Sequence, residues 1–265
     1  MTEREQLEGG IAGRYGVARE RFERALHLAR AIPEKVFESV QLHNLGDVER
    51  SPGNYAVAID RLETGLQLCR DVGAAKFVVH FLMELAELAD ARGDSVAALA
   101  FVGEGRTIVR DISNGDLEAY LIVIEGDAQA ALGRLVDAAD CYHRALAIYR
   151  ELGRTRVGLA PFAGLARVAA AVGNIEEALA HVADVEAGID AGDDLNGAAE
   201  LLWACYMVLD TARSPRAHEV LIRAHSVLTE RAKLLDEADR TTFLGNVPSH
   251  RAIMTAWAAL SSKAT

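Results

Sequence analysis

The sequence is poor in cysteine and in long apolar runs. Its 265 residues include three cysteines, which lie far apart at Cys69, Cys141 and Cys205. An odd, sparse set of this kind does not indicate a disulfide framework, so we interpret them as buried or half-buried thiols in a reducing compartment. The N-terminus is charged, and no segment approaches the roughly 18 uninterrupted apolar residues of a membrane span. These absences predict a soluble, cytoplasmic protein that does not enter a membrane.

Motifs of catalysis and cofactor binding are also missing. There is no G-x-x-x-x-G-K-[ST] loop, no G-x-S-x-G elbow and no H-E-x-x-H pair, and Gly103-Glu104-Gly105 lacks the third glycine of a nucleotide fingerprint. His80, Glu84 and Glu87 are spaced to share one helical face and could ligate a metal, but no cysteine or second histidine joins them. A solvated polar face is the preferred interpretation. We therefore expect no catalytic residues, no cofactor and no metal, and hence a protein that is not an enzyme.

Basic residues are too few to outweigh the acidic ones. Lysine and arginine total 28 against 39 aspartates and glutamates, which gives a formal charge of −11. The excess is concentrated between residues 81 and 140, where twelve acidic residues accompany four arginines. Nucleic acid binding depends on clustered Lys and Arg that neutralise phosphates. The acidic balance therefore argues against direct binding to nucleic acid.

Aromatic residues are scarce at 6%, although 51% of the chain is hydrophobic. Burial must depend mainly on Ala, Leu and Val, as expected where helices stack closely. The sequence also repeats: a glycine recurs every 40 residues, and the fifth residue after it is always alanine. The glycines are Gly13, Gly53, Gly93, Gly133 and Gly173, and the alanines are Ala18, Ala58, Ala98, Ala138 and Ala178.

A bulky residue four positions after each alanine, and usually a small one three further on, keep these side chains on one helical face. The bulky residues are Phe22, Leu62, Val102, Tyr142 and Val182, and Val185 is the exception among the small ones. A second apolar stripe precedes each glycine and predicts the other helix of a hairpin. It reads Leu42, Leu45, Gly46; Leu82, Leu85, Ala86; Phe162, Leu165, Ala166.

Two copies of the repeat are imperfect. In the third, Glu125 replaces the leucine of the stripe, so this hairpin must either repack locally or expose a carboxylate. A sixth copy aligns if the step shortens to 39 residues, with Ala217, Leu221 and Ala224 on the template and Arg213-Ser214-Pro215 in the turn. One template thus explains roughly residues 10 to 230.

This pattern resembles the tetratricopeptide repeat (TPR) family, whose motif has Leu and a small residue in the first helix, Gly at the turn, and Ala, a Phe-like residue and Ala in the second helix. The usual period is about 34 residues, and the longer unit here is similar to helical-repeat regions of large bacterial signalling and transcription-regulatory proteins. The resemblance implies an all-α, right-handed superhelical solenoid of antiparallel helix hairpins, with about six repeats plus C-terminal capping helices. We assign residues 1–235 to the solenoid and 236–265 to the cap.

The two ends of the chain need separate interpretation. Pro248 should break the chain after Asn246-Val247, and a final helix from about His250 to Leu260 would lay Ile253, Trp257 and Leu260 over the last repeat. Before Gly13 the stripe positions offer only polar residues, namely Thr2, Glu5 and Gln6. This beginning is either a polar cap or a sign that the chain is cut from a longer polypeptide.

In the TPR family, the first helices line the concave face of the superhelix, where ligands usually bind. Positions ten, six and three before each glycine share that face, and the six-before position is acidic in three successive repeats, at Asp47, Glu87 and Asp127, before it changes to Arg167. The expected partner-binding groove comprises His43, Asp47, Arg50, Met83, Glu84, Glu87, Asp90, Val123, Asp127 and Arg167. Such an acidic row would attract a partner that presents Lys or Arg. A row of charges that simply faces solvent is the alternative.

Two classes of function are compatible with this surface. The first is a non-catalytic module that binds a protein or peptide in its groove and regulates an attached signalling or transcription-regulatory domain. The second is a structural module whose self-association, as a homo-oligomer, sets the oligomeric state of a larger protein. The Lys, Arg and Asn residues with which family members clamp a C-terminal carboxylate are not matched on the concave face, so a chaperone-tail clamp is not expected.

Overall fold

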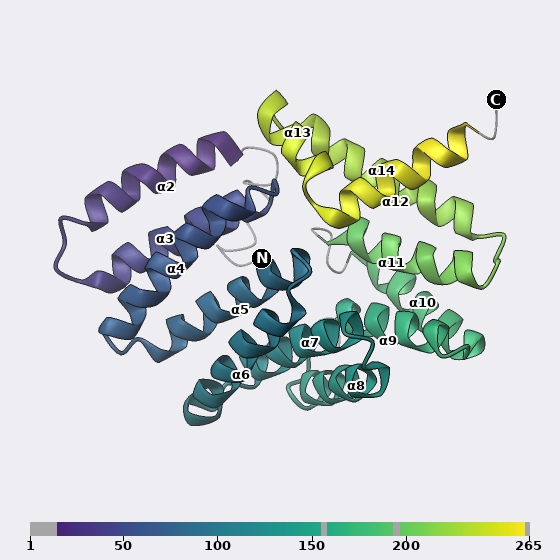
Figure 1. The fold of residues 1–265 in the computed structure, drawn as a ribbon, viewed down its shortest axis with the longest axis horizontal. Coiled ribbons are helices and arrows are strands. Elements are labelled where there is room, and N and C mark those ends of the chain that lie inside the picture. Colours follow the sequence, from purple (N-terminus) through teal and green to yellow (C-terminus); the bar gives the residue numbers. More distant parts are fainter. Residues whose placement is uncertain (1–14, 155–157, 193–196, 263–265) are drawn as a thin grey trace.

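The computed structural model describes residues 15–154, 158–192 and 197–262, and every regular element in these ranges is an α-helix (Figure 1). The helices are α2 (Tyr15–Ala29), α3 (Lys35–Arg50), α4 (Tyr55–Asp71), α5 (Ala75–Ala91), α6 (Ser95–Ile112), α7 (Gly115–Ala131), α8 (Leu135–Glu151), α9 (Leu159–Ala171), α10 (Ile175–Asp190), α11 (Ala198–Thr211), α12 (Ala217–Lys233), α13 (Glu237–Gly245) and α14 (Pro248–Ser261). Within these ranges no helix combines the length and the apolarity needed to cross a membrane.

Consecutive helices pack as antiparallel hairpins, which confirms the TPR-like solenoid expected from the sequence. The hairpins α3–α4, α5–α6, α7–α8, α9–α10 and α11–α12 follow one another, and α2 packs against α3 before them. The expected partner of α2, with Thr2, Glu5 and Gln6, falls within residues 1–14 and so lies outside the described ranges.

The recurring glycines supply the left-handed backbone of the turns inside the hairpins. Gly93 and Gly133 have φ of +82° and +75°, a conformation that glycine adopts without steric cost. The turn of the sixth copy has no glycine, but Arg213, which lies 40 residues after Gly173 and four before Ala217, takes φ of +53° there. The turn geometry is therefore kept even where the glycine is not.

The recurring alanines lie where the helices cross. Ala58, Ala98, Ala138 and Ala178 are fully buried, and Val185, the exception in the small-residue row, is buried as well. The space beside these contacts is tight: a methyl group built on Gly105 would lie 3.1 Å from the Leu121 side chain of the next hairpin. The pattern of the repeat is thus a pattern of close helix contacts.

Glu125, the residue that breaks the third copy, is accommodated by an ion pair. Its Oε2 atom lies 2.6 Å from Nη1 of Arg106 on the preceding helix, and its side chain stays partly exposed. Of the two alternatives that the sequence left open, the structure shows the exposed and paired carboxylate.

Substituting leucine for Ala98 should destabilise the fold. Ala98 has no exposed surface, so three additional heavy atoms must displace neighbouring side chains, at a cost of about 1–3 kcal/mol in the free energy of unfolding. Ala100 lies on the exposed side of the same helix, and Ala100→Leu should change the free energy by less than about 0.5 kcal/mol. Urea denaturation of both variants measures the difference, and equal losses would show that the helix register is wrong.

The last two helices pack against the last hairpin. The chain breaks before Pro248, which occupies the first turn of α14, and Ile253 of that helix is fully buried. The Trp257 ring stacks on His225 of α12 with ring centroids 4.3 Å apart. The final helix expected from the sequence is therefore present, and it packs against α11, α12 and α13.

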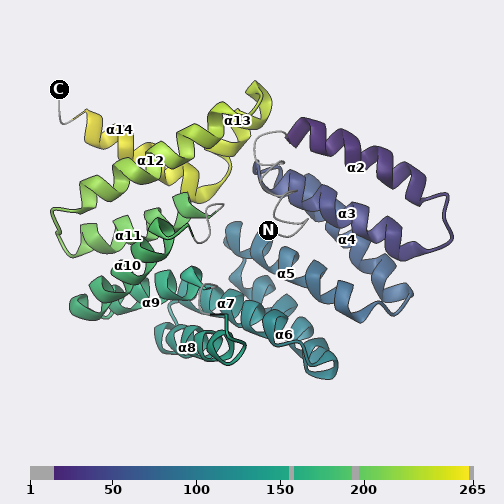
Figure 2. The same ribbon diagram turned by 180° about the vertical axis from the view of Figure 1, so that it is seen from behind.

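The solenoid curls until α13 comes round to face α2, the first described helix (Figures 1 and 2). Arg19 of α2 lies 3.2 Å from Asp239 of α13 and 2.6 Å from Glu49 of α3. Nearby, the Asn246 side-chain amide donates a hydrogen bond of 3.3 Å to the carbonyl oxygen of Gly53. These contacts turn an open superhelix into a nearly closed ring, which no feature of the repeat had indicated.

Candidate functional site

The curled solenoid encloses a cavity of about 820 Å³ on its inner side. Residues of α2, α3 and α5 line one side of it, and residues of α11, α12, α13 and α14 line the other. A smaller cavity of about 270 Å³ adjoins it, since Glu87, Ala91 and Tyr120 line both. The volume of the larger cavity suits a small molecule or a few residues of a peptide.

Arg50 is the centre of charge on the N-terminal wall. Its guanidinium group contacts three carboxylates: Nη2 lies 3.0 Å from Asp47, Nε lies 2.8 Å from Glu84, and Nη1 lies 3.0 Å from Glu87. Because all three nitrogens are occupied, Arg50 neutralises part of the expected acidic row and has little capacity for an anionic ligand.

Glu87 is the most perturbed carboxyl group in this cluster. Burial and, to a smaller extent, the neighbouring charge of Glu84 raise its pKa to about 7, against the lowering effect of Arg50. The Tyr120 hydroxyl donates a hydrogen bond to the Glu87 carboxylate. Burial and the charge of Glu87 together raise the pKa of Tyr120 well above its usual value, the charge being the larger cause.

A similar arrangement surrounds Asp127 one repeat further along. Tyr142 of α8 donates a hydrogen bond of 2.8 Å to Asp127, and Arg167 of α9 donates one of 2.7 Å to the same oxygen. Arg167 therefore pairs with the neighbouring acidic residue of its own row. It does not itself line either cavity.

The other groove residues predicted from the sequence are divided among three places. His43 lines the larger cavity, and its ring meets that of His80 at a centroid distance of 6.2 Å. Asp90 and Val123 line the smaller one, where the Asp90 carboxylate accepts a 2.8 Å hydrogen bond from the Ser95 hydroxyl. Met83 lines neither cavity, because it packs against the core formed with α6 and α7.

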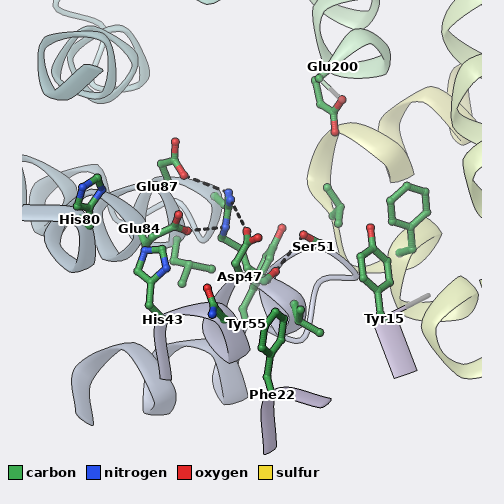
Figure 3. Close-up of a pocket in the computed structure, with 18 of the residues that line it drawn as sticks. Tyr15, Phe22, His43, Asp47, Ser51, Tyr55, His80, Glu84, Glu87 and Glu200 are labelled. Atoms are coloured by element: carbon green, nitrogen blue, oxygen red, sulfur yellow. Dashed lines mark hydrogen bonds and ion pairs between the residues drawn. The ribbon is translucent and has the colours of Figure 1, made fainter. Parts of the chain in front are cut away.

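The C-terminal wall contains residues that the sequence did not single out for a site. Glu200 of α11 enters the cavity opposite the Arg50 cluster (Figure 3). Its Oε1 atom lies 2.7 Å from Nε2 of His250, whose Nδ1 atom lies 2.8 Å from the Phe243 carbonyl oxygen. Burial alone would raise the pKa of Glu200, but the hydrogen bond and the charge of His250 outweigh it and hold this pKa below its usual value.

Arg231 and Phe243 complete this wall, with the guanidinium carbon of Arg231 5.6 Å from the centre of the Phe243 ring. Nothing in the repeat pattern brings these residues to Arg50, since the wall exists only because the chain curls back on itself. Among the residues that the structure describes, no three His, Cys, Asp or Glu side chains form a group that could hold a metal ion.

Glu87→Gln should change how stability depends on pH. The folded protein keeps the Glu87 proton up to about pH 7, whereas the unfolded chain releases it near pH 4.5, so this residue makes the wild type less stable as pH rises between those values. Relative to the wild type, the variant should gain on the order of 1–3 kcal/mol between pH 5 and pH 8. Urea denaturation at both pH values tests this, with the exposed Glu219→Gln as control. A difference from the wild type that does not change with pH would contradict the assignment.

The solved structures similar to this chain are helical-repeat proteins. They include the apo form of RapI (TM-score 0.67, 16% identity, 94% of this chain and 96% of that one). A Rap protein complexed with competence and sporulation factor matches with a TM-score of 0.65 at 13% identity, over 97% of this chain and 72% of that one. A STAND signal transduction ATPase of Pyrococcus horikoshii with a tetratricopeptide repeat sensor matches at 0.63 and 16% identity, over 94% of this chain and 42% of its own length.

These matches confirm the resemblance to TPR proteins at the level of the fold, and this chain spans less than half of the STAND protein. No protein-family model matches the sequence, and no curated protein sequence does either. With identities of 13–16%, the fold is what the structural matches establish.

Proposed function

We propose that this chain is a non-catalytic module that binds a protein or peptide segment in the cavity inside its curled solenoid. The observation that carries the proposal is the cavity itself, whose walls come from helices at both ends of the described chain. It combines aromatic surface from Tyr15, Phe22 and Tyr55 with convergent charged groups, the combination that marks ligand sites. Two of the similar structures support this interpretation, one complexed with competence and sporulation factor and one described as a sensor.

The partner that suits this surface presents Lys or Arg. Asp47, Glu84 and Glu87 share one guanidinium group, so their combined charge remains negative. A negative field of this kind speeds the encounter with basic partners and disfavours anionic ones. In a larger protein, occupancy of the cavity would regulate an attached signalling or transcription-regulatory domain.

Blocking the cavity provides the experiment. Ala91, the last residue of α5, lines both cavities, so Ala91→Trp should fill the space between them. Ala131 occupies the equivalent place at the end of α7 and lines neither cavity, which makes Ala131→Trp the matched control. Peptides selected from a random display library on the wild type should bind Ala91→Trp at least about tenfold more weakly, a loss of about 1.4 kcal/mol. Equal binding to both variants would place the site elsewhere.

Self-association is the second candidate, and one surface feature favours it. An exposed valine occupies the second or third residue of α2, α4, α6 and α8, namely Val17, Val57, Val96 and Val136. Such an apolar row would suit contact between copies of the chain. Light scattering coupled to size-exclusion chromatography should show a dimer or larger species that Val136→Glu dissociates, whereas a monomer at all concentrations would contradict this candidate.

A further inference from the structure

Glu200 retains the capacity to accept a hydrogen bond inside the cavity. One of its carboxylate oxygens, Oε1, is bound to His250, while the other, Oε2, is buried and has no hydrogen-bond partner among the described residues. Figure 3 shows this side chain reaching into the cavity from the wall opposite Glu84 and Glu87. A buried carboxylate oxygen without a donor is costly, and a ligand donor placed there would remove that cost.

His250 holds Glu200 in its charged form. Both nitrogens of the His250 ring lie against oxygen acceptors, the Glu200 carboxylate and the Phe243 carbonyl, so the ring is held in place from two sides. The free oxygen of Glu200 is thus part of a carboxylate whose position is fixed by its partner. Fixed acceptors of this kind recognise cationic donors better than mobile surface carboxylates do.

The cations that line the cavity are already engaged. Arg50 contacts three carboxylates, and Arg231 lies over the Phe243 ring and interacts with Tyr15. An anionic ligand would therefore meet four carboxylates and no uncommitted guanidinium group on this lining. A cationic ligand would find acceptors on both walls and aromatic rings between which its apolar part could pack.

The two walls belong to the two ends of the solenoid. The Arg50 cluster is on α3 and α5, whereas Glu200 is fixed by the cap through His250 of α14. Among the residues that the structure describes, the ends are joined by the Arg19–Asp239 and Asn246–Gly53 contacts and by the interaction of Arg231 with Tyr15. A ligand that touches both walls would add to this small set and hold the ring closed.

We infer that the cavity binds a peptide through a Lys, Arg or N-terminal cation that donates a hydrogen bond to Oε2 of Glu200, and that the bound peptide joins the N-terminal repeats to the C-terminal helices. This rests on the proposed function, because it names the chemistry and the consequence of binding at the same site. The contact that recognises the peptide would thus also hold the two ends of the solenoid together.

Peptide pools that differ at one position test the recognition step. The probes are random-sequence hexapeptides, acetylated and amidated at their ends, with the third residue fixed as lysine, as uncharged norleucine or as glutamate. The immobilised wild type should retain the lysine pool at least about tenfold better than the norleucine pool, as a charge-assisted hydrogen bond predicts. Glu200→Gln should reduce that preference to about twofold, while Glu219→Gln, an exposed change on α12, should leave it intact.

The outcomes separate this inference from the proposed function. Equal retention of the lysine and norleucine pools by the wild type would overturn the role of the cation and leave peptide binding standing. Retention of none of the pools would overturn both. If Glu200→Gln unfolds, Glu200→Asp supplies the same test, because the shorter carboxylate should weaken the preference for lysine and not reverse it.

Closure is measured separately, by the distance between spin labels on Arg21→Cys of α2 and Thr241→Cys of α13, both exposed positions. The three native cysteines are buried and should not react. The best lysine peptide should narrow the distance distribution, and a distribution unchanged at saturation would overturn the bridging of the two ends.

Discussion

Tyr142→Ala is expected to lower the free energy of unfolding by about 3–5 kcal/mol, the range observed when a buried aromatic side chain is deleted. Tyr142 is the largest fully buried side chain among the described residues. Its ring lies between Gly126 of α7 and Gly164 of α9, where a methyl group built on Gly126 would come within 2.7 Å of it. Two backbones approach the ring closely, so the helices cannot easily collapse into the space that it leaves.

The same geometry predicts a reversal of sign in a double mutant. In the wild type, Gly164→Ala should destabilise, since the added methyl group would overlap the Tyr142 ring. In the Tyr142→Ala background it should stabilise, because it partly fills the cavity and removes a helical glycine worth about 0.5–1 kcal/mol. Gly103→Ala, with open space around it on α6, should stabilise in both backgrounds. Additive effects of Gly164→Ala and Tyr142→Ala in denaturant unfolding would contradict this packing.

The fold could be predicted from sequence because its contacts are local and repeat. Each hairpin buries its small and bulky residues against the next hairpin. The 40-residue spacing therefore predicts that Ala98 and Gly105 lie at helix contacts, without any knowledge of the complete structure. Arg213 shows that the turn does not depend on glycine, since its backbone keeps a positive φ at that point of the turn.

The site could be predicted only in part, because it depends on contacts between residues that are far apart in the sequence. Asp47, Glu87 and Asp127 were placed in one row by their phase, and all three line a cavity. Their electrostatic partners depend on contacts between repeats, in which Arg50 reaches Glu87 and Arg167 reaches Asp127. Glu200 could not have been found, because its place opposite Arg50 depends on the rotation accumulated over several hairpins and no local pattern records that rotation.

Contacts between repeats, which the sequence pattern does not record, also determine the charge of the inner surface. The row of acidic residues suggested a continuous negative track, and the structure divides it into carboxylates that share Arg50 and one that pairs with Arg167. Burial then raises the pKa of Glu87 to about 7, so its charge depends on pH near neutrality. The inner surface therefore carries less negative charge than its number of acidic residues would suggest. The hydrogen-bond acceptors that it offers are carboxylates whose positions are fixed by their partners.

Removing the residues after Gly245 should destabilise the chain and cause aggregation, because we propose that α14 seals the last repeat. Ile253 is fully buried, and deletion of a side chain of this kind alone costs about 2–5 kcal/mol, so loss of the whole helix should exceed that. The truncation also removes His250, which leaves the half-buried Glu200 carboxylate without its partner. The apolar cluster that contains Leu221 and Phe243 would then be uncovered, and exposed apolar surface of this kind favours aggregation.

Light scattering and thermal unfolding of the truncated chain measure this effect, and two point variants separate its parts. Ile253→Ala should reproduce part of the loss of stability while the cap remains, and Thr255→Ala, on the exposed side of α14, should stay within about 0.5 kcal/mol of the wild type. If α14 acts as a seal, aggregation should follow truncation even at temperatures where Ile253→Ala remains monomeric, since only truncation uncovers the cluster. A truncated chain that stays monomeric with unchanged stability would show that the solenoid ends before α14 and does not need it.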